Sequence, residues 1–203
     1  MNKHLKLTLL TILLIIFLTT LSFKIVLKAT STTQNQQETI DFLNSKANIL
    51  DPLYETNEIS HLQDVKKVFQ KTTILFYLSL LIITLLITLN KTKSKRTTLL
   101  KNLNKASKYT LISLTTITLL TIISFNTIFK YFHLIFFPQG NWQFPNNSFI
   151  IQTFPLNFFI TISFKIFILT IIITTLIYFY TKKKIKWFSK PKELKPGFTS
   201  YYQ

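Results

Sequence analysis

Hydrophobic residues gather along this chain into four long stretches, each of which contains at most one charged residue. A helix needs about 20 apolar residues to cross the hydrocarbon core of a bilayer, because each residue adds about 1.5 Å to its length. The pattern therefore predicts an all-α integral membrane protein with four transmembrane helices. We place the four spans at about 7–27, 72–90, 109–130 and 157–180.

Between the first two predicted spans, the pattern of apolar residues changes to that of an amphipathic extracellular helix. Hydrophobic side chains recur there every three or four residues, at Ile59, Leu62, Val65 and Phe69. Three polar residues with similar spacing, Glu58, His61 and Asp64, lie on a different face of this helix. A carboxylate on either side of His61 can orient its ring and favour the imidazolium form, but an ordinary surface histidine has the same spacing.

The segment between the third and fourth predicted spans, 131–156, is aromatic and nearly uncharged. Aromatic side chains at this density are typical of a loop in the membrane interface, and we expect Trp142 at the depth of the lipid headgroups. Residues 138–141 have the composition of a turn, in which Gly140 supplies either a positive φ angle or a close approach of the backbone. His133 follows the outer end of the third span, where a histidine is either a hydrogen-bonded structural residue or a catalyst.

The charges predict which side of the membrane each loop occupies. The chain has 24 Lys and Arg against 7 Asp and Glu, and seven of the basic residues lie in each of the segments 91–108 and 181–203. Because cytoplasmic loops are rich in Lys and Arg, we expect both segments and the N-terminus to be cytoplasmic. The loops 28–71 and 131–156 then face outward, in a single membrane domain over 1–203. The excess positive charge suits anionic lipid headgroups, and we expect no nucleic-acid partner.

The composition excludes several kinds of chemistry. Without any Cys the chain has no disulfide, thiolate nucleophile or Cys-ligated metal, and its three His argue against a polyhistidine metal site. The sequence also lacks a phosphate loop, a Rossmann fingerprint and a nucleophile elbow. We therefore expect neither a metal nor a cofactor.

Lys165 is the one charged residue of the fourth predicted span and lies about 10 Å from its outer end. One interpretation is a functional charge inside the membrane. The other is a side chain that extends its ammonium group to the interface without a role in chemistry. Both interpretations stay open from the sequence.

The two segments that contain the internal histidines resemble the motifs of a known family. Residues 58–66 read E-I-S-H-L-Q-D-V-K, residues 132–144 read F-H-L-I-F-F-P-Q-G-N-W-Q-F, and residues 151–155 read I-Q-T-F-P. They resemble motifs of the lipoprotein intramolecular transacylases, a bacterial family of four-span membrane proteins whose length and helix order agree with essentially the whole chain. Members of that family typically have Glu after the last Phe-Pro, where this chain has Leu156.

The resemblance implies a reaction and its residues. The family acts on a bacterial lipoprotein whose N-terminal Cys bears a diacylglyceryl thioether, and it moves the sn-2 acyl chain from the glycerol oxygen to the Cys α-amino group. The product is the N-acyl S-monoacylglyceryl form, called the lyso form. The catalytic pair of the family are the two motif histidines, here His61 and His133. The implied partners are the diacylated lipoprotein and membrane lipids.

We assign different roles to the two histidines from their sequence surroundings. His133, in an almost uncharged segment, is expected to be neutral and to act as general base, whereas His61 is expected to be the protonated partner. For both rings to reach one ester, the helix with His61 must fold back over the outer mouth of the bundle, with the rings roughly 4 to 8 Å apart. The candidate substrate-binding or supporting residues are Glu58, Asp64, Asn141, Trp142 and Lys165.

Two other functions fit the same residues. The first is a non-enzymatic membrane subunit that contacts a partner through the aromatic loop. The second is a lipid ester hydrolase that uses the same histidine pair with water as nucleophile. A subunit tolerates loss of both histidines, and a hydrolase releases free fatty acid where a transacylase conserves the acyl chain. The sequence makes no prediction of oligomeric state.

Overall fold

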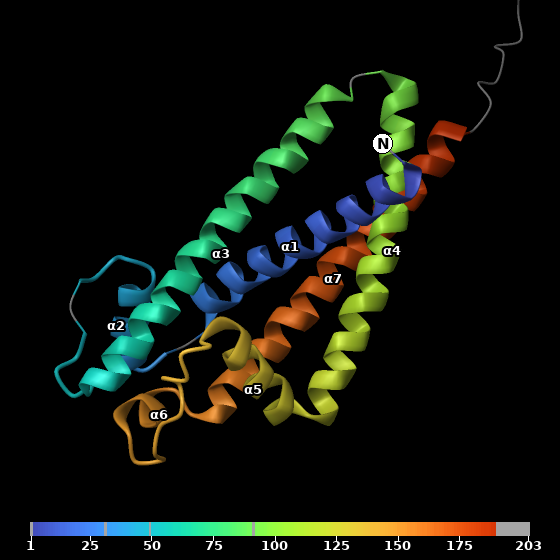
Figure 1. Cartoon of the computed structure of the whole chain (residues 1–203). Helices are drawn as coiled ribbons and strands as arrows, with labels where there is room; N and C mark the ends of the chain where they lie inside the picture. The colour runs from blue at the N-terminus through green and yellow to red at the C-terminus, as the bar shows by residue number, and fades with distance from the viewer. Residues whose placement is uncertain (1, 31, 49, 91, 190–203) are drawn as a thin grey trace, which may run out of the picture.

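The computed structural model describes residues 2–30, 32–48, 50–90 and 92–189, and helices are the only regular elements in these ranges (Figure 1). The elements are α1 (Lys3–Ala29), α2 (Gln34–Leu43), α3 (Thr56–Leu89), α4 (Lys93–Ile123), α5 (Phe125–Phe136), α6 (Phe149–Thr153) and α7 (Leu156–Ser189). Four of them, α1, α3, α4 and α7, are long and apolar enough to cross a membrane. The prediction of an all-α membrane protein with four long apolar helices is confirmed.

The helices α1, α4 and α7 pack against one another through an apolar cluster around Leu14, Leu18 and Ala106, and through small side chains. Small residues let helices approach closely in a membrane. Close packing matters there because the hydrophobic effect does not drive helices together in lipid, where the acyl chains are as apolar as the side chains. Asn104 of α4 adds a polar link, since its amide donates to the Tyr178 carbonyl and to the Thr181 hydroxyl of α7, both at 2.9 Å. The small residues buried in this bundle are Thr20, Ser22, Ala106, Ser107, Thr110, Thr121, Thr170, Thr174 and Thr181.

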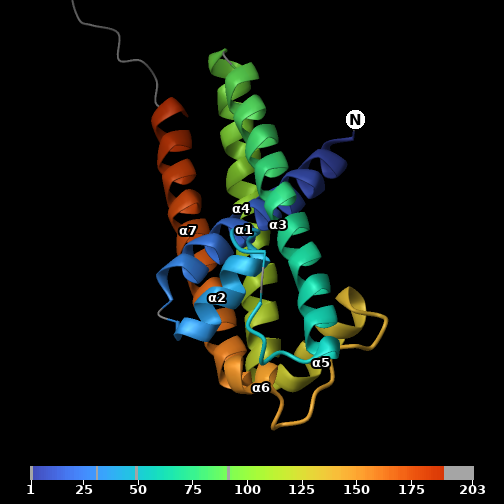
Figure 2. The ribbon, with the colours of Figure 1, turned by 90° about the vertical axis from the view of Figure 1, so that its left-hand side faces the viewer.

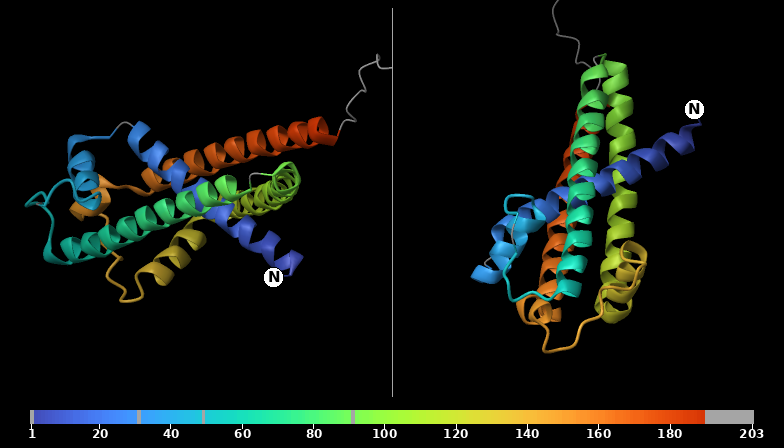
Figure 3. Two further views of the ribbon diagram at one scale, coloured as in Figure 1. Left: turned by 90° about the horizontal axis from the view of Figure 1, so that it is seen from above. Right: turned by 60° about the vertical axis from the view of Figure 1, so that its left-hand side comes forward.

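Helix α3 stands apart from this three-helix bundle over much of its length. It contacts mainly α1 and α2, and in its apolar part, 72–89, Ser79 alone is buried. Figure 1 shows α3 and α4 joined at one end and diverging toward the other, where α5 lies. Figure 3 shows α1 crossing the other long helices obliquely. Along 72–89, α3 therefore buries few of its side chains against the rest of the described chain.

The short elements gather at one end of the molecule. Figure 2 shows α2, α5 and α6 at the end opposite the α3–α4 connection. Tyr54 and Leu62 pack with Phe42 and Leu43 of α2 and with Ile150 of α6 into one apolar cluster. These contacts fix the first turns of α3, which precede the predicted span 72–90.

Three predicted boundaries differ from the structure. The predicted amphipathic helix is continuous with the second span, and together they form α3, a helix of 34 residues or about 50 Å. The predicted third span, 109–130, is broken at Ser124, whose φ of −149° and ψ of 66° are not helical. The predicted cytoplasmic loop 91–108 is helical from Lys93 onward. Of the predicted tail, residues 190–203 lie outside the described residues.

Candidate active site

His61 of α3 and His133 of α5 lie beside each other at the end of the molecule that carries the short helices. Their ring centroids are 6.1 Å apart, and the ring planes are inclined by 28°. Both side chains are buried, with 6% and 8% exposure. We expected the two rings to lie roughly 4 to 8 Å apart, so that both could reach one ester group. The observed distance confirms this expectation.

The break at Ser124 explains how the two rings meet. Instead of continuing α4, the chain turns and α5 runs back toward the first turns of α3 (Figures 1 and 2). The helix with His61 was expected to fold back over the bundle, and that expectation is wrong, because α3 continues directly into its span. The returning helix is α5, which brings His133 to His61.

Aromatic side chains from α5 and from the following loop surround the histidine pair. Trp142 was expected as an anchor among the headgroups, and the structure places it, half-buried, against the ring of His133. Water therefore has limited access to the pair. The ring centroid distances are 4.8 Å for His61–Phe137, 5.6 Å for His61–Phe144, 4.2 Å for His133–Phe129 and 4.9 Å for His133–Trp142.

A backbone carbonyl selects the tautomer of His133. Nδ1 of its ring lies 2.8 Å from the carbonyl oxygen of Phe129. Because a carbonyl can only accept, Nδ1 carries the hydrogen and Nε2 of the neutral ring holds the lone pair. Burial lowers the pKa of His133, and the bond to Phe129 opposes that shift only in part. His133 is therefore neutral at pH 7, as expected for a base.

His61 lies in the first turns of α3, ahead of the uncharged span, and it is also neutral. Its pKa is lowered from 6.5 to about 4, mainly by burial and to a smaller extent by the neighbouring His133. Asn141 and Asp64 raise the pKa, but by less. The expectation that flanking carboxylates keep His61 protonated is therefore wrong, because burial outweighs the charge of Asp64.

Glu58 has a structural role that its spacing did not reveal. Its side chain is 1% exposed. One carboxylate oxygen accepts from the backbone N–H of Glu55 at 2.8 Å, and the other accepts from the N–H of Ile150 at 3.0 Å. Glu58 thus caps α3 and ties its first turn to α6, 92 residues away in the chain.

We expect Glu58→Ala to lower the thermal stability of the purified protein in detergent. The change leaves two N–H groups without an acceptor, and each such loss costs about 1 to 3 kcal/mol. Glu58→Gln retains an oxygen acceptor and should lose less. The measurement is the unfolding midpoint, with Glu38→Ala on the exposed face of α2 as matched control. An unchanged midpoint for Glu58→Ala would contradict the capping role.

Asp64 anchors the turn at 138–141 to α3. Its carboxylate accepts from Lys67 at 2.8 Å, from Gln139 at 2.6 Å and from Asn141 at 3.0 Å. The bond from Lys67 has the largest effect in lowering the pKa of Asp64, so the carboxylate is charged. Gly140 has a φ of +80° with open space around it, which confirms the positive φ and not the close approach.

Lys165 is not brought to the histidine pair by any described contact. Its side chain is exposed on α7, and within the described ranges it has no hydrogen bond or ion pair. Of the sequence-predicted residues, the structure thus joins His61, His133, Asp64, Asn141 and Trp142 at one place. The residues that the sequence did not single out are Phe129, Phe137, Gln139 and Phe144.

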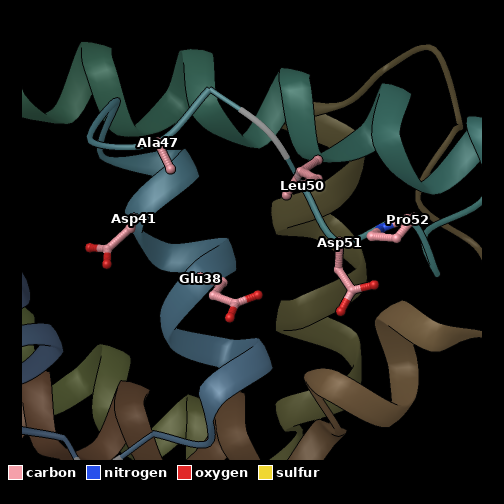
Figure 4. A pocket seen from close by; sticks show the side chains of 6 residues that line it. All are labelled: Glu38, Asp41, Ala47, Leu50, Asp51 and Pro52. Atoms are coloured by element: carbon pink, nitrogen blue, oxygen red, sulfur yellow. The ribbon is translucent and has the colours of Figure 1, made fainter.

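A separate acidic hollow of about 340 Å³ opens beside α2 (Figure 4). Glu38, Asp41 and Asp51 line it, but the carboxylates of Asp41 and Asp51 point away from each other (Figure 4). Among the described residues, no cluster of three or more His, Cys, Asp or Glu is arranged to hold a metal ion. Neither histidine of the pair lines this hollow, so the chemistry of the pair is separate from it.

Comparisons with known proteins bear directly on this arrangement. Residues 7–159 match the family profile of the lipoprotein intramolecular transacylase Lit. No curated protein matches the chain. A structure of the membrane integral lipoprotein intramolecular transacylase Lit from Bacillus cereus is 21% identical, with a TM-score of 0.64, and covers 92% of this chain and 100% of that chain.

A second structure of the Bacillus cereus protein, with a histidine-to-alanine mutation, is 20% identical, with a TM-score of 0.64, and covers 91% of this chain and 94% of that chain. At this identity the structures show a shared fold. The match of the family profile extends over well more than half of the chain and includes both histidines of the pair. The chain therefore belongs to the lipoprotein intramolecular transacylase family.

Proposed function

We propose that this protein moves the sn-2 acyl chain of an S-diacylglyceryl lipoprotein to the α-amino group of its N-terminal Cys. The product is the N-acyl S-monoacylglyceryl lipoprotein. The observation that carries the proposal is the histidine pair: two buried neutral imidazoles, 6.1 Å apart, enclosed by aromatic rings in a member of this family. The partners are the diacylated lipoprotein and the lipids of the membrane.

The protons of this reaction require a base that later becomes an acid. An α-amino group has a pKa of about 8, so it must lose one proton to become a nucleophile and a second after it attacks the ester carbonyl. The leaving glyceryl oxygen takes back one proton, and the other goes to water. A neutral imidazole accepts the proton from nitrogen and, once charged, gives it to the glyceryl oxygen.

His133 is the general base in this proposal, with Nε2 as the accepting atom because Nδ1 is bonded to Phe129. His61 serves as the second proton carrier. The two rings disfavour simultaneous charging, since the charge of His133 lowers the pKa of His61. When one imidazole is protonated, the other therefore has a lower affinity for a proton. The bound proton is then passed more readily to the leaving glyceryl oxygen.

The aromatic walls supply the remaining part of the mechanism. Nucleophile and ester belong to one substrate molecule, so holding them in an attack-ready conformation gives much of the rate enhancement. Phe137 and Trp142, which contact the rings of the pair, limit the access of water to the tetrahedral intermediate. Exclusion of water also distinguishes acyl transfer to the amine from hydrolysis.

The protein is proposed to lie in the cell membrane with both termini cytoplasmic and the histidine pair at the extracellular face. The N-terminus, the basic start of α4 and the end of α7 lie at one end of the bundle, and α5 lies at the other (Figures 1 and 2).

We expect an impermeant thiol reagent on intact cells to label Gln143→Cys and not Lys101→Cys. Labelling of position 101 alone would reverse the orientation.

The function is tested by mass spectrometry of a lipoprotein N-terminal peptide. The peptide is taken from cells that lack this family's activity, with and without this protein. The expected result is conversion of the diacylglyceryl form to the lyso form without release of fatty acid. Release of free fatty acid would instead support the ester hydrolase, and an unchanged lipoprotein would support a non-enzymatic subunit.

A further inference from the structure

Two buried polar atoms beside the histidine pair lack a hydrogen-bond partner. Within the part of the chain that the structure describes, Nδ1 of His61 and the side-chain oxygen Oδ1 of Asn141 are both unpaired. Buried polar groups in native proteins are normally satisfied, so each unpaired atom needs an explanation. One atom can donate and the other can only accept, which makes them a complementary pair.

The amide of Asn141 has a fixed orientation. Its nitrogen Nδ2 donates to the Asp64 carboxylate at 3.0 Å, and a charged carboxylate can only accept. The NH₂ group therefore faces Asp64, and Oδ1 is directed elsewhere. Asp64 is itself held by Lys67 and Gln139, so the amide has little freedom to flip.

The turn that carries Asn141 lies over the ring of His61. Phe137 and Phe144, on either side of this turn, contact that ring with centroid distances of 4.8 and 5.6 Å. The Asn141 amide also lies 3.5 Å from the hydroxyl of Ser60, the residue before His61, and Asn141 raises the pKa of His61. The turn and the ring are thus placed for a short rearrangement to join Nδ1 and Oδ1.

We propose that Asn141 is a positioning residue whose Oδ1 accepts the hydrogen of Nδ1 of His61, so that Nε2 of His61 holds the lone pair. His133 is set in the same way by the Phe129 carbonyl. The pair then presents two Nε2 lone pairs, one for each proton that must leave the substrate nitrogen. This consequence for catalysis rests on the proposed function, whereas the tautomer itself does not.

The charged surroundings of His61 are few. From α5 it faces His133, and on its own helix it faces Asp64, which is paired with Lys67. Glu58, one turn earlier, gives both carboxylate oxygens to backbone N–H groups. Asp64 therefore acts on His61 mainly through the amide that it holds, and Asn141 decides which nitrogen carries the hydrogen.

The tautomer can be measured without activity. The full-length protein is labelled with ¹⁵N-histidine in bicelles, and the His61 signals are assigned with His61→Gln. We expect wild-type His61 to carry its hydrogen on Nδ1 at pH 7.5, and Asn141→Leu to shift the ring toward the Nε2–H tautomer. Gln143→Ala, at an exposed position of the same loop, is the matched control and should leave the tautomer unchanged. An Nε2–H ring in the wild type, or no change in Asn141→Leu, would overturn the proposal.

If Asn141→Leu fails to fold, a second variant in which the residues at positions 64 and 141 are exchanged tests the same proposal. In the double variant Asp64→Asn, Asn141→Asp, donor and acceptor are reversed and the turn stays anchored. The carboxylate introduced at position 141 still accepts from Nδ1, and as a nearby opposite charge it favours imidazolium. We expect lyso-form production to persist with its acid limb shifted upward by about 1 pH unit or more. An active double variant with an unshifted limb would show that position 141 does not act on His61.

Discussion

His133→Ala is expected to abolish detectable lyso-form production while the protein remains folded in the membrane. Loss of general acid–base help typically costs a factor of about 10² to 10⁴ in rate. The ring bonds only to a carbonyl of its own helix, and the hydrogen bonds that tie α3 to the loop and to α6 come from Asp64 and Glu58, so these bonds stay in place. The measurement is lipid analysis of a lipoprotein N-terminal peptide from cells that express matched membrane levels of each variant.

The controls for this prediction come from the same chain. His61→Ala should also be severe, because the reaction moves two protons off nitrogen and each ring offers one lone pair. Lys165→Met should retain near-normal activity, since this side chain is exposed on α7. Full lyso-form product from the double variant His61→Ala, His133→Ala would remove the histidine pair from the chemistry.

The long helices could be predicted because they depend on local composition alone. An uncharged stretch such as 72–90 has one stable state in a bilayer, whatever its tertiary partners. The break at Ser124 could not be predicted in this way, because Ser is common inside membrane helices and its neighbours are apolar. That break determines the position of His133, so His133 could be singled out from its motif, whereas the route that brings it to α3 could not be predicted.

The roles of the acidic residues show what spacing along one helix leaves out. Glu58 and Asp64 are each one turn from His61, which suggested that both stabilise its charge. Glu58 instead bonds to Ile150, and Asp64 bonds to Gln139 and Asn141, all of which are more than 70 residues away in the chain. Such long-range partners follow only from the tertiary structure.

The protonation of His61 was predicted with the wrong sign for a related reason. The sequence allows charges to be counted, but it does not give the burial of a side chain that an incoming loop covers. Phe137 and Phe144 cover His61, and the resulting desolvation lowers its pKa more than Asp64 raises it. The mechanism therefore begins with two neutral rings, and this difference is measurable.

The pH dependence of kcat/KM is expected to show no loss of activity as the pH rises from 6.5 to 8. Neutral imidazole is the active form. Because the pKa of each ring is lowered, the rings become protonated and inactive only below pH 6.5, and His61 only toward about pH 4. Deprotonation of the substrate amine, with a pKa of about 8, should instead make the rate increase with pH. If the active form required a protonated His61, kcat/KM would instead fall as the pH rises above 6.5, because the ring would lose its proton there.

The measurement uses purified protein in detergent with a synthetic diacylglyceryl lipopeptide between about pH 5 and pH 9, a range that spans the ordinary pKa values of imidazole and amine. A second lipopeptide with a less basic α-amine shows which group causes the rise of kcat/KM with pH. The rise should move to lower pH only if it reflects deprotonation of the substrate amine. A rise that stays in place with the second substrate, or a rate that falls through neutral pH, would assign the titration to the enzyme. Either result would require one histidine to be charged before the substrate binds, which the burial of both rings opposes.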